Sequence, residues 1–355
     1  MSEVERGVPV LEVRRLKRYF PVGGVPLFGR ARQVLKAVDD ASFTLYEGET
    51  LGLVGESGSG KSTLGRSILR LIEPTSGEVL YRGRDIVPLR GGEVRALRRH
   101  MQMVFQDPYS SLNPRMRIGA IIREPLDVFG LGTAAERQRQ VEALLDRVGL
   151  DASFVKRHPH QLSGGQRQRV GIAAALALGP SVIVADEPTS ALDVSVQAQI
   201  LNLLSHLQQE LRLSLLFISH NLSVVEHVSD RIAVMYLGKI VETAPKAQLF
   251  SSPQHPYTKA LLAAVPLPNP RQIQRGVLVS DEMPSPLNPP SGCPFHPRCP
   301  EAVEVCKRDV PPLQEYAAGS RVACHVAAAR LGLPNPISRE QEGEGEIPPA
   351  VTRHD

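Results

Sequence analysis

Short apolar runs alternate with amphipathic stretches along most of the chain. The apolar runs are expected to form strands, and they are 50–54, 101–105, 181–185 and 215–218. The run 181–185 is apolar at nearly every position, as in a parallel strand that is buried on both faces. Apolar residues recur at helical spacing in 134–148 and 194–213, which predicts amphipathic helices. This alternation of strands and helices favours an α/β core.

The flanks of this core have their own patterns. We expect further strands at 10–13 with 16–20, at 37–45 and at 78–81, a surface loop at 21–31, and a terminal strand pair at 231–236 and 239–242. Residues 110–160 differ in texture, with a turn at 110–114 and then helical spacing, which indicates a helical insertion. A helix of small and apolar residues is expected at 167–178.

Length and charge narrow the classes of protein. The chain has 355 residues, enough for one large domain and a smaller second one. Its 41 basic and 37 acidic residues are scattered and leave a net charge of +4, so charge does not predict nucleic acid as a partner. Residues 1–20 lack the apolar centre of a secretory signal, and the apolar segment 170–185 is too short to span a membrane. We therefore expect a cytosolic chain that reaches a membrane only through a partner.

The apolar run 50–54 leads into a glycine-rich segment with the sequence GESGSGKST. Strand, glycine-rich loop and helix start in this order predict a phosphate-binding loop. Glycines allow successive N–H groups to turn around an anion at a helix N-terminus. Lys61 is expected to reach the β- and γ-phosphates, Ser62 to bind Mg²⁺, and Thr63 to support the helix start. The predicted nucleotide-contacting residues of the loop are Gly55, Glu56, Ser57, Gly58, Ser59, Gly60, Lys61, Ser62 and Thr63.

Polar side chains follow three of the expected strands. Asp186 and Glu187 end the run 181–185, Gln106 follows 101–105, and His220 follows 215–218. The carboxyl ends of parallel strands are where open α/β sheets bind ligands. Asp186 and Gln106 are candidate Mg²⁺ ligands, Glu187 can polarise a water for attack on phosphorus, and His220 can donate to the γ-phosphate. Each residue taken alone also has an ordinary structural interpretation, such as a helix N-cap or a satisfied polar side chain.

Two aromatic residues precede the phosphate-binding loop. Tyr19 or Phe20 could stack on a purine base through its ring face, or could simply belong to the core. The residue chemistry alone leaves these two interpretations equal.

With these motifs in place, the chain resembles the nucleotide-binding subunit of an ATP-binding-cassette (ABC) transporter over about residues 10–245. The matching segments are Gly55–Ser62 (Walker A), Gln106 (Q-loop), Leu162–Gln166 (the LSGGQ signature), Val182–Asp186 (Walker B), Glu187 (the catalytic glutamate), Ser190–Asp193 (D-loop) and His220 (the switch histidine). The resemblance implies a P-loop NTPase cassette, with a RecA-like parallel-sheet core, an antiparallel β subdomain and a helical subdomain at about 110–175. It also implies that Phe20 stacks on the adenine ring, with Tyr19 as the second choice.

The resemblance further implies that two cassettes pair head to tail. The signature residues Ser163, Gly164, Gly165 and Gln166, together with Asp193, would then contact ATP that the partner holds. ATP would close the pair and its hydrolysis would open it.

Two segments narrow the resemblance to bacterial oligopeptide and dipeptide importers. They are residues 104–114 and 252–262. These importers use two cassette subunits, and the sequence around Tyr109 is more similar to the second of them. The implied partners are a second, related ABC ATPase, two transmembrane permease subunits and, indirectly, an extracytoplasmic peptide-binding protein. The implied place is the cytoplasmic face of the bacterial inner membrane. We expect a nucleotide-binding domain at 1–250, a small C-terminal regulatory domain of the oligopeptide-importer type at 251–333, and a disordered tail at 334–355.

The second domain carries all the cysteines of the chain. Cys293, Cys299, Cys306 and Cys324 are separated by five, six and seventeen residues. Four thiolates in a short region suit zinc or an iron–sulfur cluster, and the spacing does not select between them. The importer resemblance favours a 4Fe-4S cluster, with zinc second. His296 and His325 are possible substitute ligands, although each has an incidental interpretation.

Three functions are compatible with these motifs. The first is an ATPase that powers peptide import, with a nickel chelate or another solute as an alternative cargo. The second is a soluble ABC ATPase regulator, and the third is a metal-cluster sensor with a structural nucleotide site. Glu187 and His220 argue against the third, because a purely structural site has no need of them.

Overall fold

The computed structural model describes residues 7–23, 33–264 and 283–334. The expected disordered tail lies outside these residues, apart from its first position. An eight-stranded sheet forms the centre, in the order β11-β12-β10-β9-β3-β8-β7-β6. Its strands are β3 (Thr50–Val54), β6 (Met101–Val104), β7 (Val182–Asp186), β8 (Ser214–Ser219), β9 (Arg231–Tyr236), β10 (Lys239–Pro245), β11 (Gln314–Ala317) and β12 (Ser320–Val322). The neighbours from β9 to β6 run parallel, which confirms the predicted α/β core.

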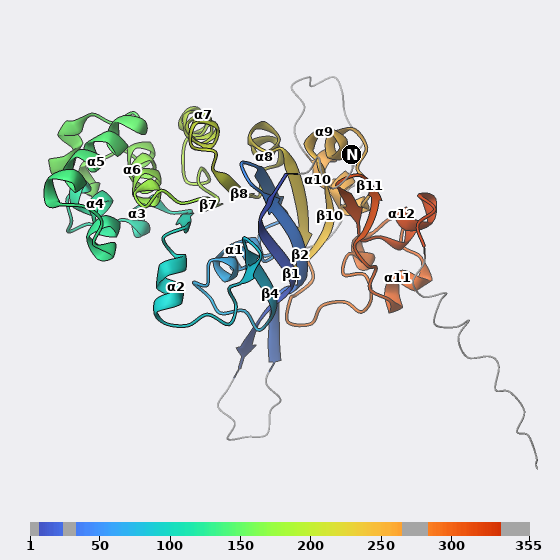
Figure 1. Ribbon diagram of the computed structural model, residues 1–355. Helices are drawn as coiled ribbons and strands as arrows, with labels where there is room; N and C mark the ends of the chain where they lie inside the picture. The colour runs from blue at the N-terminus through green and yellow to red at the C-terminus, as the bar shows by residue number, and fades with distance from the viewer. Residues whose placement is uncertain (1–6, 24–32, 265–282, 335–355) are drawn as a thin grey trace, which may run out of the picture.

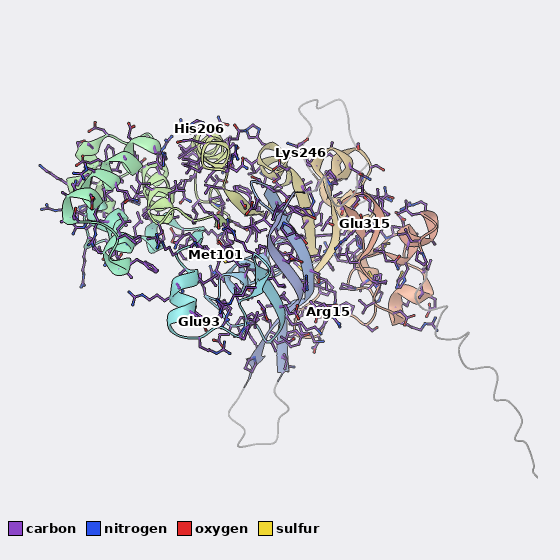
Figure 2. The ribbon with its side chains drawn as sticks, viewed as in Figure 1. Arg15, Glu93, Met101, His206, Lys246 and Glu315 are labelled. Carbon is purple, nitrogen blue, oxygen red and sulfur yellow. The ribbon has the colours of Figure 1, made fainter. Side chains whose placement is uncertain are left out.

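A second sheet of four antiparallel strands packs against the centre (Figure 1). It contains β1 (Pro9–Val22), β2 (Gln33–Tyr46), β4 (Ser76–Tyr81) and β5 (Arg84–Asp85). Residues 10–13 and 16–20 belong to one strand, which continues to Val22 and so occupies the start of the expected loop. The interruption is a bulge at the exposed Arg15 (Figure 2), whose φ is +48°. Its Nε lies 3.4 Å from Asp40 Oδ1.

One helix lies between the two sheets. The helix α1 (Lys61–Ile68) buries Leu64 and Ile68 against apolar residues of both sheets. The helix also passes very close to the central sheet, because a side chain at Gly65 would lie 2.8 Å from Ile218 and 2.9 Å from Val184. The start of α1 is thus fixed at the carboxyl end of β3.

Helices also cover the other face of the central sheet. They are α7 (Val194–Leu211) and α8 (Leu222–Val228), and the buried residues Ile200, Leu204 and Val225 of these helices join the apolar cluster there. Met101, at the start of β6, is 3% exposed near the centre of the molecule (Figure 2). The short helix α2 (Gly92–Leu97) precedes this strand.

A helical lobe lies at one side of the molecule (Figure 1). It contains α3 (Pro108–Ser111), α4 (Ile118–Phe129), α5 (Ala134–Arg147) and α6 (Gly164–Leu176), with 3₁₀ turns η3 (Ala152–Lys156) and η4 (Pro159–Gln161). The prediction of a turn at 110–114 is wrong for residues 110 and 111, which are helical because Asp107 caps α3 and proline occupies its first position. The helix expected at 167–178 begins at Gly164, where Ser163 caps it, and ends at Leu176.

The C-terminal residues continue the central sheet at the opposite side (Figure 1). The strand β12 pairs with β10, where Glu242 lies opposite Val322. The helices here are α9 (Lys246–Ser251), α10 (Pro256–Ala263), α11 (Glu304–Arg308) and α12 (His325–Arg330), with the 3₁₀ turn η5 (His296–Arg298). Cys293, Phe295 and Cys306 belong to the same apolar cluster as the central strands. This region therefore shares the core of the cassette. In the part of the chain that the structure describes, no helix is long and apolar enough to cross a membrane.

Candidate nucleotide site

The phosphate-binding loop joins the buried strand β3 to α1. Gly60, which precedes α1, has a φ of +102°, and a Cβ there would lie 2.0 Å from the carbonyl oxygen of Ala37. Gly58 has a φ of +80°. Both positions therefore need glycine. No side chain caps α1, so the N–H groups at its start are free to donate hydrogen bonds to an anion.

Lys61 is held against this loop. Its Nζ donates to the carbonyl oxygens of Gly55 and Glu56, each at 2.8 Å, and lies 3.3 Å from Ser59 Oγ. Burial lowers the pKa of Lys61, while the carboxylates of Glu187 and Asp186 act in the opposite direction. The loop thus positions a cation directly beside the N-terminus of α1.

Ser62 and Asp186 bring two oxygen donors together. Ser62 Oγ donates to Asp186 Oδ1 at 2.7 Å. Asp186 is fully buried, its Oδ2 has no hydrogen-bond partner, and Arg66 Nη2 lies 3.6 Å from that oxygen. Burial raises the pKa of Asp186, and the bond from Ser62 opposes that rise. A hydroxyl and a carboxylate are ligands that Mg²⁺ prefers, so the residues present fit this ion.

Glu187 lies at the meeting point of three strand ends. Gln106 Nε2 donates to Glu187 Oε2 at 2.9 Å, and His220 Nδ1 lies 3.2 Å from the same oxygen. Glu187 has a φ of +46°, which is uncommon for a residue with a side chain, and its N–H donates to the carbonyl of Ile218 at 2.9 Å. The three polar residues predicted from separate strand ends are therefore one contiguous cluster. Such a carboxylate can take a proton from a water beside the bound phosphate.

The signature residues lie on a different part of the molecule. Ser163 and Gln166 form a capping box at the start of α6, in which Ser163 N–H donates to Gln166 Oε1 at 3.0 Å. Gly165 packs so closely on α7 that a Cβ would lie 2.4 Å from Val196. Gly164 faces Leu192 in the same way at 3.2 Å. The helix α6 belongs to the helical lobe, whereas α1 lies between the sheets (Figure 1). A single chain therefore does not bring its signature residues to its own phosphate-binding loop.

The remaining predicted nucleotide contacts are Asp193, Tyr19 and Phe20, and they lie in different surroundings. Asp193 is exposed at the start of α7 and makes no side-chain capping bond. Tyr19 donates its hydroxyl hydrogen to Asp39, and the Lys36 ammonium lies 5.8 Å from the centre of its ring. The Arg18 guanidinium lies 4.3 Å from the centre of the Phe20 ring. Both aromatic residues are half-buried, so neither is a simple core residue.

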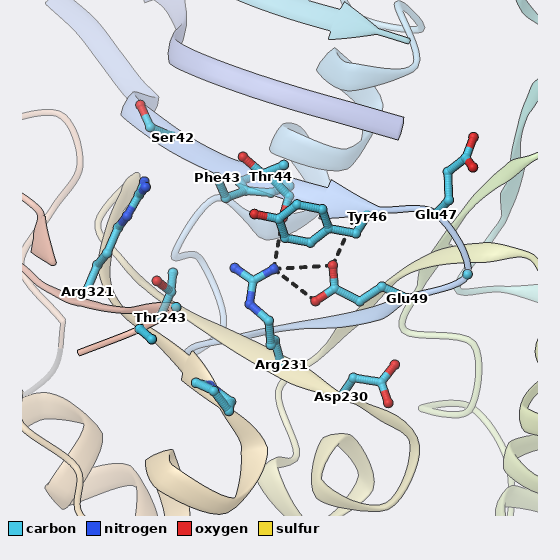
Figure 3. A pocket seen from close by; sticks show the side chains of 14 residues that line it. Ser42, Phe43, Thr44, Tyr46, Glu47, Glu49, Asp230, Arg231, Thr243 and Arg321 are labelled. Carbon is cyan, nitrogen blue, oxygen red and sulfur yellow. Dashed lines mark hydrogen bonds and ion pairs between the residues drawn. The ribbon is translucent and has the colours of Figure 1, made fainter. Parts of the chain in front are cut away.

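A further pocket opens at the opposite edge of the central sheet, where β3 and β9 begin (Figure 3). The Glu49–Arg231 ion pair, at 2.9 Å, lies within it, and Arg231 also faces Tyr46 at 5.3 Å from the ring centre. Burial raises the pKa of Glu49, and Arg231 opposes that rise. Phosphate-binding loop and pocket are thus at opposite ends of the same strand, and the sequence patterns did not indicate this pocket.

The four cysteines gather in the C-terminal region. Burial raises the pKa of Cys293 to about 12 and that of Cys299 to about 11, and the neighbouring cysteines add to both shifts. Cys293 N–H donates to the carbonyl of Cys306 at 2.8 Å. Within residues 7–23, 33–264 and 283–334, however, no group of three or more His, Cys, Asp or Glu side chains is arranged to hold a metal ion. The arrangement therefore does not support the predicted iron–sulfur cluster or zinc.

The sequence patterns also missed residues that surround the site. Arg66 lies beside Asp186, and Tyr257 and Arg298 contact Glu56 from the C-terminal region. Arg66 is one helical turn after Ser62 on α1, so helical spacing could have indicated it. Nothing in the local sequence indicates the other two.

Comparison with known proteins agrees with a nucleotide-binding site at this position. A family model described as "ABC transporter" matches residues 38–190, and one described as "Oligopeptide/dipeptide transporter, C-terminal region" matches residues 241–306. A probable peptide ABC transporter ATP-binding protein of Sinorhizobium fredii is 56% identical over 319 residues, which cover 90% of each chain. The oligopeptide transport ATP-binding protein AppF of Bacillus subtilis is 53% identical, over 89% of this chain and 97% of that protein.

Solved structures agree with these matches. A dimeric ATP-binding cassette in a post-hydrolysis state, bound to ADP and phosphate, superposes with a TM-score of 0.59 at 30% identity. The match covers 66% of this chain and 98% of that one. The chain belongs to the ATP-binding subunits of ABC transporters, in the branch that carries the oligopeptide/dipeptide transporter C-terminal region.

Proposed function

We propose that this chain is the ATP-hydrolysing subunit of a bacterial importer of oligopeptides or dipeptides. The observation that carries the proposal is the convergence of Gln106 and His220 on Glu187, beside the Ser62–Asp186 pair. These groups are what phosphoryl transfer to water needs, namely a base, an oxygen donor set for Mg²⁺ and polar groups that orient both. The C-terminal family match and the names of the relatives support the peptide cargo.

In the proposed mechanism, α1 and Lys61 bind the triphosphate through N–H groups and charge. Ser62 and Asp186 would hold Mg²⁺, which would neutralise charge that develops on the phosphate oxygens. Glu187 accepts a proton from the attacking water, and Gln106 and His220 hold its carboxylate in place. His220 in addition can donate to the γ-phosphate.

The proposed assembly is a pair of cassettes. Ser163, Gly164, Gly165 and Gln166 lie at the start of α6 in the helical lobe, apart from the phosphate-binding loop of the same chain, which supports a role at the loop of a second, related ABC ATPase. The resemblance adds Asp193 to this set. Two permease subunits would hold this pair at the cytoplasmic face of the inner membrane. An extracytoplasmic peptide-binding protein would supply the cargo. Closure by ATP then follows if the nucleotide binds the closed pair better than the open one.

Two substitutions test the nucleotide site. Lys61→Ala removes the buried cation and is expected to lower ATP affinity, since charge-assisted phosphate contacts are strong. Glu187→Gln keeps the shape of the site and removes the base, so ATP should still bind while turnover falls by a factor of about 10² or more. Equilibrium binding and phosphate release measure the two effects separately. Unchanged phosphate release by the Gln variant would contradict the assigned role of Glu187.

A 4Fe-4S cluster at the four cysteines is the finer part of the proposal, with zinc as the alternative. What supports it is the importer resemblance together with the occurrence of all four cysteines between positions 293 and 324. Metal binding would replace their protons. Anaerobic purification followed by iron, sulfide and zinc analysis tests it. The comparison variant is Cys299→Ser, which lacks one of the four proposed ligands. Zinc at one equivalent without iron would contradict the cluster, and the absence of both metals would contradict any metal at this position.

A further inference from the structure

Glu56, the second residue of the phosphate-binding loop, is held from two sides. Its carbonyl accepts a hydrogen bond from Lys61 Nζ at 2.8 Å, on the nucleotide side. Its N–H donates to Tyr257 Oη at 2.9 Å, and its carboxylate oxygens lie 3.2 Å and 3.1 Å from Arg298 Nη1. Tyr257 belongs to α10 and Arg298 to η5, so both lie in the C-terminal region. A single loop residue thus joins Lys61 to a region far away in the sequence.

The two C-terminal residues are themselves firmly placed. Tyr257, Tyr236 and Phe295 form an aromatic cluster with ring centres 4.7 to 5.4 Å apart. Tyr236 and Phe295 are fully buried, and Tyr257 is 1% exposed. Arg298 follows Phe295 by three residues, and its Nη1 also contacts Tyr236 Oη at 3.4 Å. Aromatic packing therefore decides where the contacts to Glu56 lie.

The Glu56–Arg298 pair differs from an ordinary surface ion pair. The Arg298 side chain is 8% exposed and that of Glu56 is 31% exposed. Exposed pairs contribute little, whereas loss of one partner of a buried pair leaves an uncompensated charge. Here the uncompensated charge would be a carboxylate in the loop that receives an anion. Without Arg298, the unpaired Glu56 carboxylate should therefore repel the triphosphate. The loop should also be held less firmly.

We propose that Tyr257 and Arg298 are positioning residues for the phosphate-binding loop, through which residues 283–334 and α10 set the affinity of this site for nucleoside triphosphate. The inference rests on the proposed function of the loop around Lys61. It makes the C-terminal region part of the nucleotide site, since changes there reach Glu56 through two direct contacts. Both residues act through Glu56, which they contact directly.

The test measures ATP binding by the full chain. Arg298→Gln should weaken ATP affinity at least about fivefold, the lower end of common coupling between sites. Tyr257→Phe removes only the hydroxyl and should weaken affinity less. Lys259→Gln is the matched control, because Lys259 forms a 3.0 Å ion pair with Glu301 in the same region and does not contact the loop. It should bind ATP within about twofold of wild type, because neither member of this half-buried pair is as enclosed as Arg298.

A double variant separates positioning from general destabilisation. Glu56→Gln combined with Arg298→Gln removes the uncompensated carboxylate, so the double variant should bind ATP more tightly than Arg298→Gln alone. Melting temperatures measured without nucleotide report any loss of fold. The inference is overturned if Arg298→Gln binds ATP as wild type does, or if Glu56→Gln recovers none of its loss. Failure of the proposed function looks different, since Lys61→Ala would then bind ATP as tightly as wild type.

Discussion

At the scale of single residues, position in space gives Glu187 its chemistry. A glutamate at a strand end is ordinary, but this one lies at 2.9 Å from Gln106 and 3.2 Å from His220, beside the buried Asp186. Its φ of +46° lies in the left-handed region, which residues with a side chain rarely adopt. Strain of this kind is concentrated at functional sites, where the surrounding structure maintains it.

Glycine is needed at one position of the loop for two separate reasons. Gly60→Ala would place a methyl group 2.0 Å from the carbonyl of Ala37 at a φ of +102°. The left-handed conformation alone costs about 1–2 kcal/mol for a residue with a side chain. We expect a lower melting temperature and loss of ATP binding.

The matched control for this substitution is Gly171→Ala in α6. Apart from its chain neighbours and the backbone of its own helix, no atom lies within 4 Å of a Cβ built there, and its φ is not positive. Alanine in a helix interior is expected to stabilise by up to about 1 kcal/mol. Equal melting temperatures for the two variants would show that Gly60 does not need its special conformation.

At the scale of elements, the start of α10 depends on buried polar groups. His255 caps this helix by accepting from Tyr257 N–H at 3.0 Å. Glu242 of β10 accepts from the N–H groups of Gln254 and His255 at 2.8 Å and 2.9 Å. Both side chains are about fully buried, so α10 is tied to the central sheet by bonds that exclude water. This connection fixes the element that carries Tyr257.

Burial of His255 makes stability depend on pH. Its pKa is lowered from 6.5 to about 3, chiefly by burial. The unfolded chain binds a proton below pH 6.5 and the native chain does not until about pH 3, so acid favours unfolding. Between these values the free energy of unfolding should fall by at most about 1.4 kcal/mol per pH unit through this group. The stabilisation is fully present above pH 6.5.

Denaturant unfolding of His255→Asn measures this contribution. Asparagine can still cap a helix but does not titrate, so the variant should lose less stability on acidification than wild type does. The other titratable groups are common to both proteins and cancel in the comparison. His206→Asn is the control, because its side chain is 72% exposed. An identical pH slope for wild type and His255→Asn would contradict the expected role of this histidine.

At the scale of the whole molecule, the chain carries two separate halves of the proposed site. The phosphate-binding loop lies between the sheets, whereas Ser163 begins a helix of the helical lobe (Figure 1). The proposed pair of cassettes would join these halves in trans. The solved cassette with a TM-score of 0.59 is itself dimeric.

Pairing should depend on nucleotide. Glu187→Gln mixed with its cognate cassette is expected to associate in ATP and Mg²⁺, because the trapped nucleotide bridges the two halves. Size-exclusion chromatography with light scattering measures the mass. The Lys61→Ala, Glu187→Gln double variant is the control and should remain unpaired. Absence of ATP-dependent association in the single variant would refute the shared site.

The strand–loop–helix order around Lys61 could be predicted because its residues are local in the chain. Strand, glycines and Lys61 follow one another without interruption, and helical spacing identified the buried residues Val141, Leu144 and Leu145 of α5. The strand that reaches Val22, the helix at 108–111 and the sheet continuation by β11 and β12 were not anticipated. These depend on pairing and capping partners that local periodicity does not contain.

The sequence by itself determined the family, the phosphate-binding loop and the polar residue at each strand end, since these depend on residue type and short spacing. Only the tertiary structure decided which of them touch. Gln106 meets Glu187 across 81 positions, and Arg298 meets Glu56 across 242. Such contacts follow from strand order and aromatic packing, which bring distant segments together and leave no local pattern in the chain.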